Sequence, residues 1–150
     1  MKGLIFIFLA LSAFVVQSKV SIMGIPPALT VIAPYYMGLR GGARKGMITG
    51  SLIGMIEDSL SGNVLGTHLL GKGLIGFSSS LLSGSLFRWT PLLGIIGLFS
   101  LTVIDGLTIF ITKTIFNIQF IPVSRLITTV LFQGVLNSLA GMFLRPENAE

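Results

Sequence analysis

The chain has 150 residues, of which 52% are hydrophobic and only 10% are charged, and its mean hydropathy is +0.92. Because a soluble domain carries roughly 25% charged residues, this composition excludes an ordinary soluble domain and indicates a membrane protein. The absence of cysteine excludes disulfides, thiolate chemistry and cysteine-ligated metals. The net charge of +5 favours basic cytoplasmic loops over nucleic-acid binding.

The apolar stretches, taken in chain order, predict an all-α membrane protein. At about 20 residues per transmembrane helix, the chain has room for at most about six spans in one integral membrane domain, residues 1–150. The first stretch follows Met-Lys as in a signal peptide but lacks a small-residue cleavage site, so we expect an uncleaved helix. The predicted spans cover about residues 3–17, 20–39, 44–60, 64–87, 91–112 and 121–144.

Small residues give the third and fourth predicted spans a smooth surface. Glycines recur at every fourth residue from Gly42 to Gly54, and Asp58 falls on the next step of the series. On an α-helix this spacing forms one stripe, against which a second backbone can pack closely. Packing inside the bundle and association with a partner helix both fit such a stripe. The candidate interface residues are Gly42, Gly46, Gly50, Gly54, Gly66, Gly71 and Gly76.

Basic residues outside the spans predict the orientation in the membrane. With six spans, six of these residues lie on one side and two on the other. The positive-inside rule therefore predicts that both termini are cytoplasmic. The six are Lys2, Arg40, Arg44, Lys45, Arg88 and Arg145, and the two are Lys19 and Lys113.

Charged residues inside four different spans are expected at similar depth, in the outer half of the bundle. Each would cost about 2.5–3.5 kcal/mol at a helix centre, so these side chains should face the interior and pair. We predict the pairs Asp58–Lys72 and Asp105–Arg125, with an exchange of partners left open. Such a cluster fits internal ion pairs, an outward-facing ligand pocket or a polar seam for a partner helix. Its predicted members are Glu57, Asp58, His68, Lys72, Asp105 and Arg125.

Enzyme chemistry is not indicated by the sequence. It contains no Gly-x-Ser-x-Gly, no His-Glu-x-x-His and no phosphate-binding loop. Its single histidine has no second histidine at helical spacing, as a metal site on a helix would need. We therefore expect no catalytic residue, no bound metal and no cofactor.

The run from Gly46 to Phe77, GMITGSLIGMIEDSLSGNVLGTHLLGKGLIGF, resembles the signature region of the rod shape-determining protein MreD family. A glycine-spaced helix ends in Gly54 and Asp58, and a glycine follows at residue 66. The next helix carries Lys72 and then Gly76-Phe77. The last predicted span is also similar to that of the family, through Leu136-Asn137-Ser138 and Leu144-Arg145-Pro146.

This resemblance implies a non-enzymatic scaffold in the bacterial inner membrane that takes part in cell-wall elongation. The implied partners are the single-pass protein MreC and, through it, the actin-like MreB, the glycosyltransferase RodA and a class B penicillin-binding protein. We expect the membrane helix of MreC to contact the small-residue faces of the third and fourth spans. The family is also similar in fold to the six-helix substrate-binding components of energy-coupling-factor transporters, so small-molecule binding is the alternative function.

Overall fold

The computed structural model describes residues 12–20, 25–61, 66–83, 88–116 and 122–146. Within these ranges every secondary-structure element is a helix, which confirms the predicted all-α class. Residues 12–19 are helical, and the 3₁₀-helix η1 (Leu29–Val31) leads into the first long helix. The following elements are α2 (Ile32–Ser61), α3 (Thr67–Ser79), the 3₁₀-helix η2 (Ser80–Leu82), α4 (Pro91–Ile115) and α5 (Val123–Gly141).

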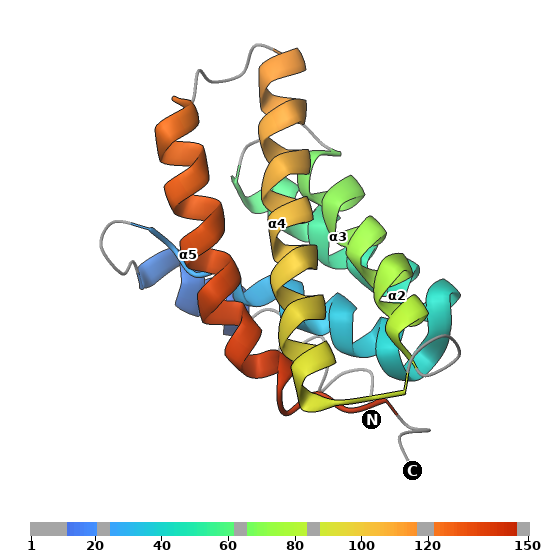
Figure 1. The fold of residues 1–150 in the computed structure, drawn as a ribbon. Coiled ribbons are helices and arrows are strands. Elements are labelled where there is room, and N and C mark those ends of the chain that lie inside the picture. Colours follow the sequence, from blue (N-terminus) through green and yellow to red (C-terminus); the bar gives the residue numbers. More distant parts are fainter. Residues whose placement is uncertain (1–11, 21–24, 62–65, 84–87, 117–121, 147–150) are drawn as a thin grey trace.

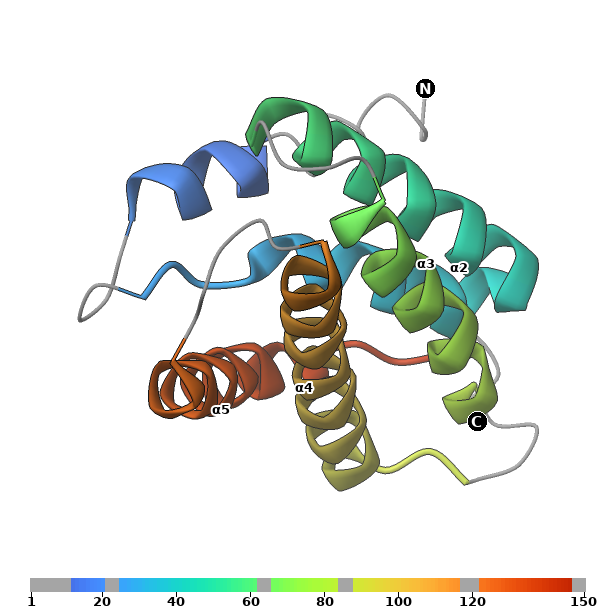
Figure 2. The same cartoon turned by 90° about the horizontal axis from the view of Figure 1, so that it is seen from above.

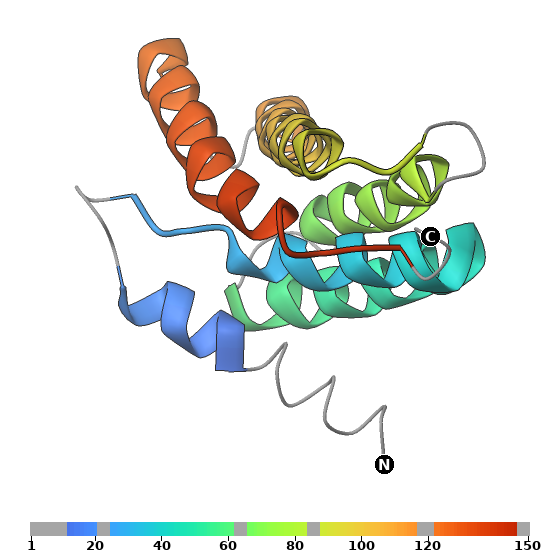
Figure 3. The same ribbon diagram turned by 60° about the horizontal axis from the view of Figure 1, so that its bottom comes forward.

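The helix α2 consists of two helical arms that meet at Gly42. This residue has φ 78° and ψ 175°, a backbone conformation that residues with a Cβ rarely adopt. The chain reverses direction there, so the two arms lie side by side (Figure 3). The turn falls in the gap between the second and third predicted spans, which end at residue 39 and begin at residue 44.

The first arm of α2, residues 32–41, lies at the centre of the bundle. Its Tyr35 and Leu39 are buried and pack in one core cluster with Ile75 of α3 and Leu98 of α4. Viewed along the bundle, α4 and α5 lie on one side of this arm and the second arm of α2 lies on the other (Figure 2). The central arm therefore sets the positions of the helices around it.

The helices α4 and α5 are antiparallel neighbours (Figure 1). The first begins with Thr90 as its N-cap, whose side chain accepts a hydrogen bond from the Leu93 amide at 3.1 Å, and with Pro91 at its first position. A Cβ placed on Gly94 would lie 2.2 Å from the carbonyl oxygen of Gly141, so the two backbones touch near this end. A cleft between the two helices lies toward the opposite end.

Large apolar side chains point outward on each of the long helices. Leu52 on α2, Leu74 on α3, Ile111 on α4 and Leu131 on α5 are all exposed. In the described ranges, ten polar or charged residues are instead buried. An apolar exterior combined with buried polar and charged side chains is typical of a protein surrounded by lipid.

Among the described residues, two helices are long and apolar enough to cross a membrane. They are α4 and α5, whose most apolar windows have mean hydropathies of 2.1 and 1.2. With 13 residues, α3 covers about 20 Å and is shorter than the span predicted at residues 64–87. The topology of six spans stays a prediction, and residues 3–11 of the first predicted span lie outside the described ranges.

Candidate functional site

The second arm of α2 packs on α3 through a line of glycines that leaves no room for side chains. A Cβ placed on Gly46 would lie 2.1 Å from the carbonyl oxygen of Gly76, and one on Gly50 would lie 2.0 Å from that of Lys72. Gly54 makes the same kind of backbone contact one turn further on. The glycines thus join two helices of this chain, which favours packing inside the bundle over association with a partner helix. We call Gly46, Gly50, Gly54 and Gly76 the glycine seam.

The other predicted interface glycines have different roles. Gly42 lies outside the helical stripe, contrary to the prediction, because its positive φ breaks α2 into two arms. Gly66 has φ 116° directly before α3 and has no neighbour within 4 Å of an added Cβ. Gly71 faces α4, since its Cβ would lie 2.4 Å from an oxygen of Asp105. Gly38 lies one step earlier in the same sequence series, and its Cβ would lie 2.3 Å from a carbonyl oxygen of α3, a contact that the prediction missed.

Asp58, in the last turn of α2, accepts hydrogen bonds from the first turn of α3. Its two carboxylate oxygens lie 2.8, 2.9 and 3.2 Å from the amide nitrogens of Gly66, His68 and Leu69. The same carboxylate lies 2.7 Å from Nδ1 of His68. Amides at the start of a helix have no partner within it, and its dipole favours a negative charge there. Asp58 therefore acts as the N-cap of a neighbouring helix.

We expect Asp58→Ala to lower the free energy of unfolding by about 1–3 kcal/mol, because three amides at the start of α3 lose their acceptor. Hydrogen exchange of the Gly66, His68 and Leu69 amides should become faster in the same variant. Ser59→Ala is the matched control, since that exposed hydroxyl donates to the Met55 carbonyl oxygen within α2. Unchanged exchange at these three amides would contradict the capping role.

Lys72 connects three helices through buried ion pairs. Its side chain is 2% exposed and forms an ion pair with Glu57 of α2. Its Nζ also lies 3.9 Å from an oxygen of Asp105 on α4. A buried lysine needs such partners because an uncompensated charge inside a bundle is costly. The three residues therefore link α2, α3 and α4 at one depth.

The observed pairs differ from the predicted pairs Asp58–Lys72 and Asp105–Arg125. Lys72 pairs with Glu57, the residue before Asp58, because the carboxylate of Asp58 is directed at the first turn of α3. Asp105 has Lys72 as its cation. Arg125 lies exposed in the first turn of α5, outside the cluster, and lines the cleft between α4 and α5. The structure thus brings together five of the six predicted cluster residues.

Glu57 has two further partners that the sequence analysis missed. Its Oε1 accepts a hydrogen bond from the Gln17 side chain at 2.6 Å. The hydroxyl of Thr30, in η1, lies 3.4 Å from both carboxylate oxygens of Glu57 and 3.3 Å from Oε1 of Gln17. The only sign of these contacts in the sequence is that Gln17, an amide side chain, lies at the end of the apolar first predicted span. These bonds attach residues 12–20, through Gln17, and residues 25–31, through Thr30, to the charged cluster.

Two amide side chains on α5 hold the segment before η1. Asn137 donates to the carbonyl oxygen of Ala28 at 2.9 Å and to the Thr102 hydroxyl of α4 at 3.3 Å. Gln133 donates to the carbonyl oxygen of Pro26 at 2.6 Å. The helix α5 is therefore attached to the bundle by polar contacts that are independent of the charged cluster.

The geometry of the charged cluster suits a structural role. Glu57, Asp58, Lys72 and Asp105 are all less than a tenth exposed, so a partner helix has little access to them. In the described part of the chain, no group of three His, Asp or Glu side chains is arranged so that it could hold a metal ion. The pairs join α2 to α3 and α3 to α4, and they fix the register of these three helices against one another.

Comparison with known proteins identifies the family of this chain. The family model described as rod shape-determining protein MreD matches residues 1–146 of this chain, and the match includes the seam and the cluster. No curated protein and no solved structure matches the chain significantly, so the likeness to transporter components has no support from a related structure. Because the family match covers nearly the whole chain, the protein belongs to the MreD family of rod shape-determining membrane proteins.

Proposed function

We propose that this protein is a non-enzymatic scaffold of the cell-wall elongation machinery in the bacterial inner membrane. It docks the membrane helix of MreC, and through MreC it helps to position MreB, RodA and a class B penicillin-binding protein. The family match over residues 1–146 carries this proposal, since the family acts in rod-shape determination. Both termini are proposed to lie in the cytoplasm, as the distribution of basic residues predicts.

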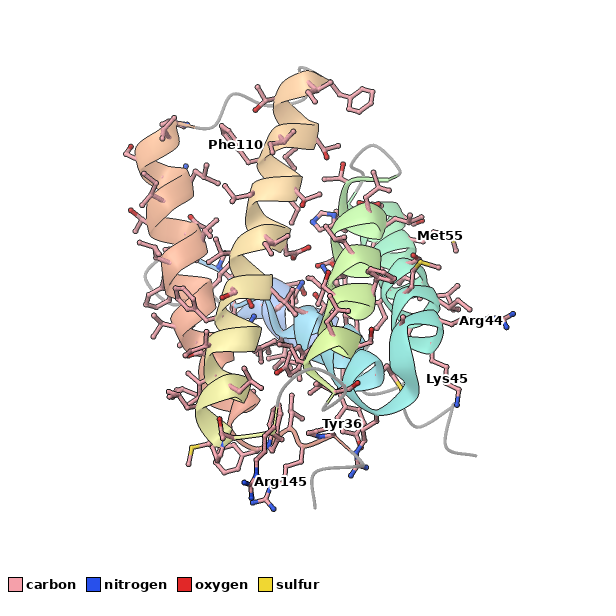
Figure 4. All side chains as sticks on the ribbon, turned by 45° about the vertical axis from the view of Figure 1, so that its right-hand side comes forward. Tyr36, Arg44, Lys45, Met55, Phe110 and Arg145 are labelled. Carbon is pink, nitrogen blue, oxygen red and sulfur yellow. The ribbon has the colours of Figure 1, made fainter. Side chains whose placement is uncertain are left out.

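The docking face lies on the exposed apolar sides of α2 and α3. Their glycine faces are already occupied by each other, so a third helix has to use other sides of the same pair. The second arm of α2 carries Leu52 and Met55, which are 52% and 43% exposed, and Met55 points away from the bundle (Figure 4). Leu74 on α3 is 46% exposed. We call Leu52, Met55 and Leu74 the docking face.

A photo-crosslinking amino acid at single positions tests this face in living cells. We expect adducts with MreC from Leu52 or Leu74, because a docked helix lies within reach of these side chains. Leu131 and Leu139 on α5 are matched controls, with exposures of 48% and 64%, and should give lipid adducts only. MreC adducts from α5 alone would mean that MreC docks on α5 and not on α2 and α3. The absence of MreC adducts from all four positions in correctly inserted protein would contradict the docking function.

A further inference from the structure

The cleft between α4 and α5 has the form of a small binding site. Its volume is about 440 Å³, within the range of roughly 300–1,000 Å³ that small-molecule sites occupy. It lies where the C-terminal end of α4 and the N-terminal end of α5 separate, opposite the contact of Gly94 with Gly141. Because α4 and α5 are the two described helices apolar enough to cross a membrane, this end is expected to meet the membrane surface.

The polar part of the cleft is basic. Lys113 in the last turn of α4 and Arg125 in the first turn of α5 both line it, and none of the described residues in the lining is an aspartate or glutamate. Within the described ranges neither cation has a salt bridge, because the carboxylate predicted to pair with Arg125, Asp105, is held by Lys72. His68, the third basic residue in the lining, is already engaged by Asp58. Two cations on facing helices are therefore left without a counter-charge.

Apart from Thr129 and Gln133, the remaining described wall of the cleft is apolar. Ile109 and Phe110 of α4 face Leu126 and Val130 of α5 across it. Phe110 lies on the side of α4 that faces α5, below the end that carries the cations (Figure 4). A free phosphate ion would use the cations and leave this wall without a partner. A molecule with an anionic head and an alkyl chain would contact both parts.

We propose that this cleft binds one anionic phospholipid. The phosphate of its headgroup lies between Lys113 and Arg125, and an acyl chain occupies the apolar wall between α4 and α5. Basic pockets between transmembrane helices are known to bind the anionic headgroups of lipids. The lipid site is on the opposite helices from the docking face, so it stands whether or not MreC docks on α2 and α3.

Native mass spectrometry of the full chain, released from membranes of defined lipid content, tests the site. In a mixture of phosphatidylglycerol and phosphatidylcholine, we expect one retained phosphatidylglycerol with a preference of roughly tenfold. Lys113→Gln combined with Arg125→Gln should abolish the preference. Arg44→Gln combined with Lys45→Gln is the matched control and should retain it, because both residues are exposed on α2 and point away from the bundle (Figure 4).

Three outcomes would overturn the lipid site. One is equal retention of the two lipids by the wild-type protein. Another is an unchanged preference for phosphatidylglycerol in the variant that lacks both cations. Each single variant is measured as well, so that a double variant that does not fold still leaves a readout. The third is full displacement of phosphatidylglycerol by millimolar inorganic phosphate, which would identify a site for a small anion instead. Loss of the preference in both single variants, with unchanged thermal stability, would support it.

Discussion

Replacing Lys72 by methionine is expected to remove about 3–5 kcal/mol from the free energy of unfolding, the largest effect of any single charge substitution in this protein. The substitution leaves Glu57 and Asp105 buried, close to each other and without their shared cation. The methionine side chain keeps most of the volume, so the loss reports on charge and not on a cavity. The measurement is the midpoint of thermal or denaturant-induced unfolding in detergent, together with the amount of protein in the membrane.

A double-mutant cycle identifies the partner of Lys72. Glu57→Gln with Lys72→Met should be milder than Lys72→Met alone, because Glu57→Gln removes one of the two carboxylates that Lys72→Met leaves uncompensated. Asp58→Asn with Lys72→Met should instead give nearly additive losses, since Asp58 is directed at the amides of α3. The sequence alone had favoured the opposite result for the pair Asp58–Lys72. A strong coupling in the second cycle and none in the first would contradict the observed pairing.

Gly76→Ala is expected to destabilise the protein by about 3 kcal/mol or to prevent its stable accumulation. The added methyl group would lie 2.0 Å from the carbonyl oxygen and 2.3 Å from the carbonyl carbon of Gly46. Both are backbone atoms, so the two helices have to separate along the whole glycine seam. The same unfolding midpoint and membrane yield provide the measurement.

Gly73→Ala, on the same helix, is the matched control. Its methyl group would meet only the hydroxyl of Ser51, at 2.7 Å, and then nothing closer than 3.9 Å. A serine side chain can rotate away, and alanine favours a helix over glycine by up to about 1 kcal/mol. We therefore expect a change within about 1 kcal/mol. Similar losses in the two variants would mean that helix separation at the seam is not what limits stability.

The parts of this fold that follow a helical period could be predicted from the sequence. The four-residue spacing of the glycines identified a close contact, and the scarcity of charges in apolar stretches identified five residues that do lie together. Gly42 shows where periodicity misleads. It has the correct spacing, but its positive φ ends the first arm of α2, and spacing carries no information about φ.

The partner of each charge could not be predicted, because pairing depends on the relative height of neighbouring helices. A shift of one residue exchanges Glu57 for Asp58, and the contact that decides between them involves backbone amides of α3, which have no sequence signature. The contribution of Gln17 depends on how residues 12–19 lie against the end of α2, and the position of Arg125 depends on where α4 and α5 separate. These are distances between helices, and they follow only from the packed structure.

The N-cap that Asp58 supplies to α3 also bears on how the chain enters the membrane during synthesis. Glu57 and Asp58 leave the ribosome before α3, so for a short time the end of α2 carries two acids without Lys72 and without the amides that later bind them. Each acid would add a cost of up to about 2.5–3.5 kcal/mol if α2 moved into lipid alone. Waiting for α3 removes that cost, because the seam and the ion pair form as soon as the second helix is present. In the predicted six-span topology, insertion of α2 and α3 together as a helical hairpin is therefore favoured over insertion of α2 alone.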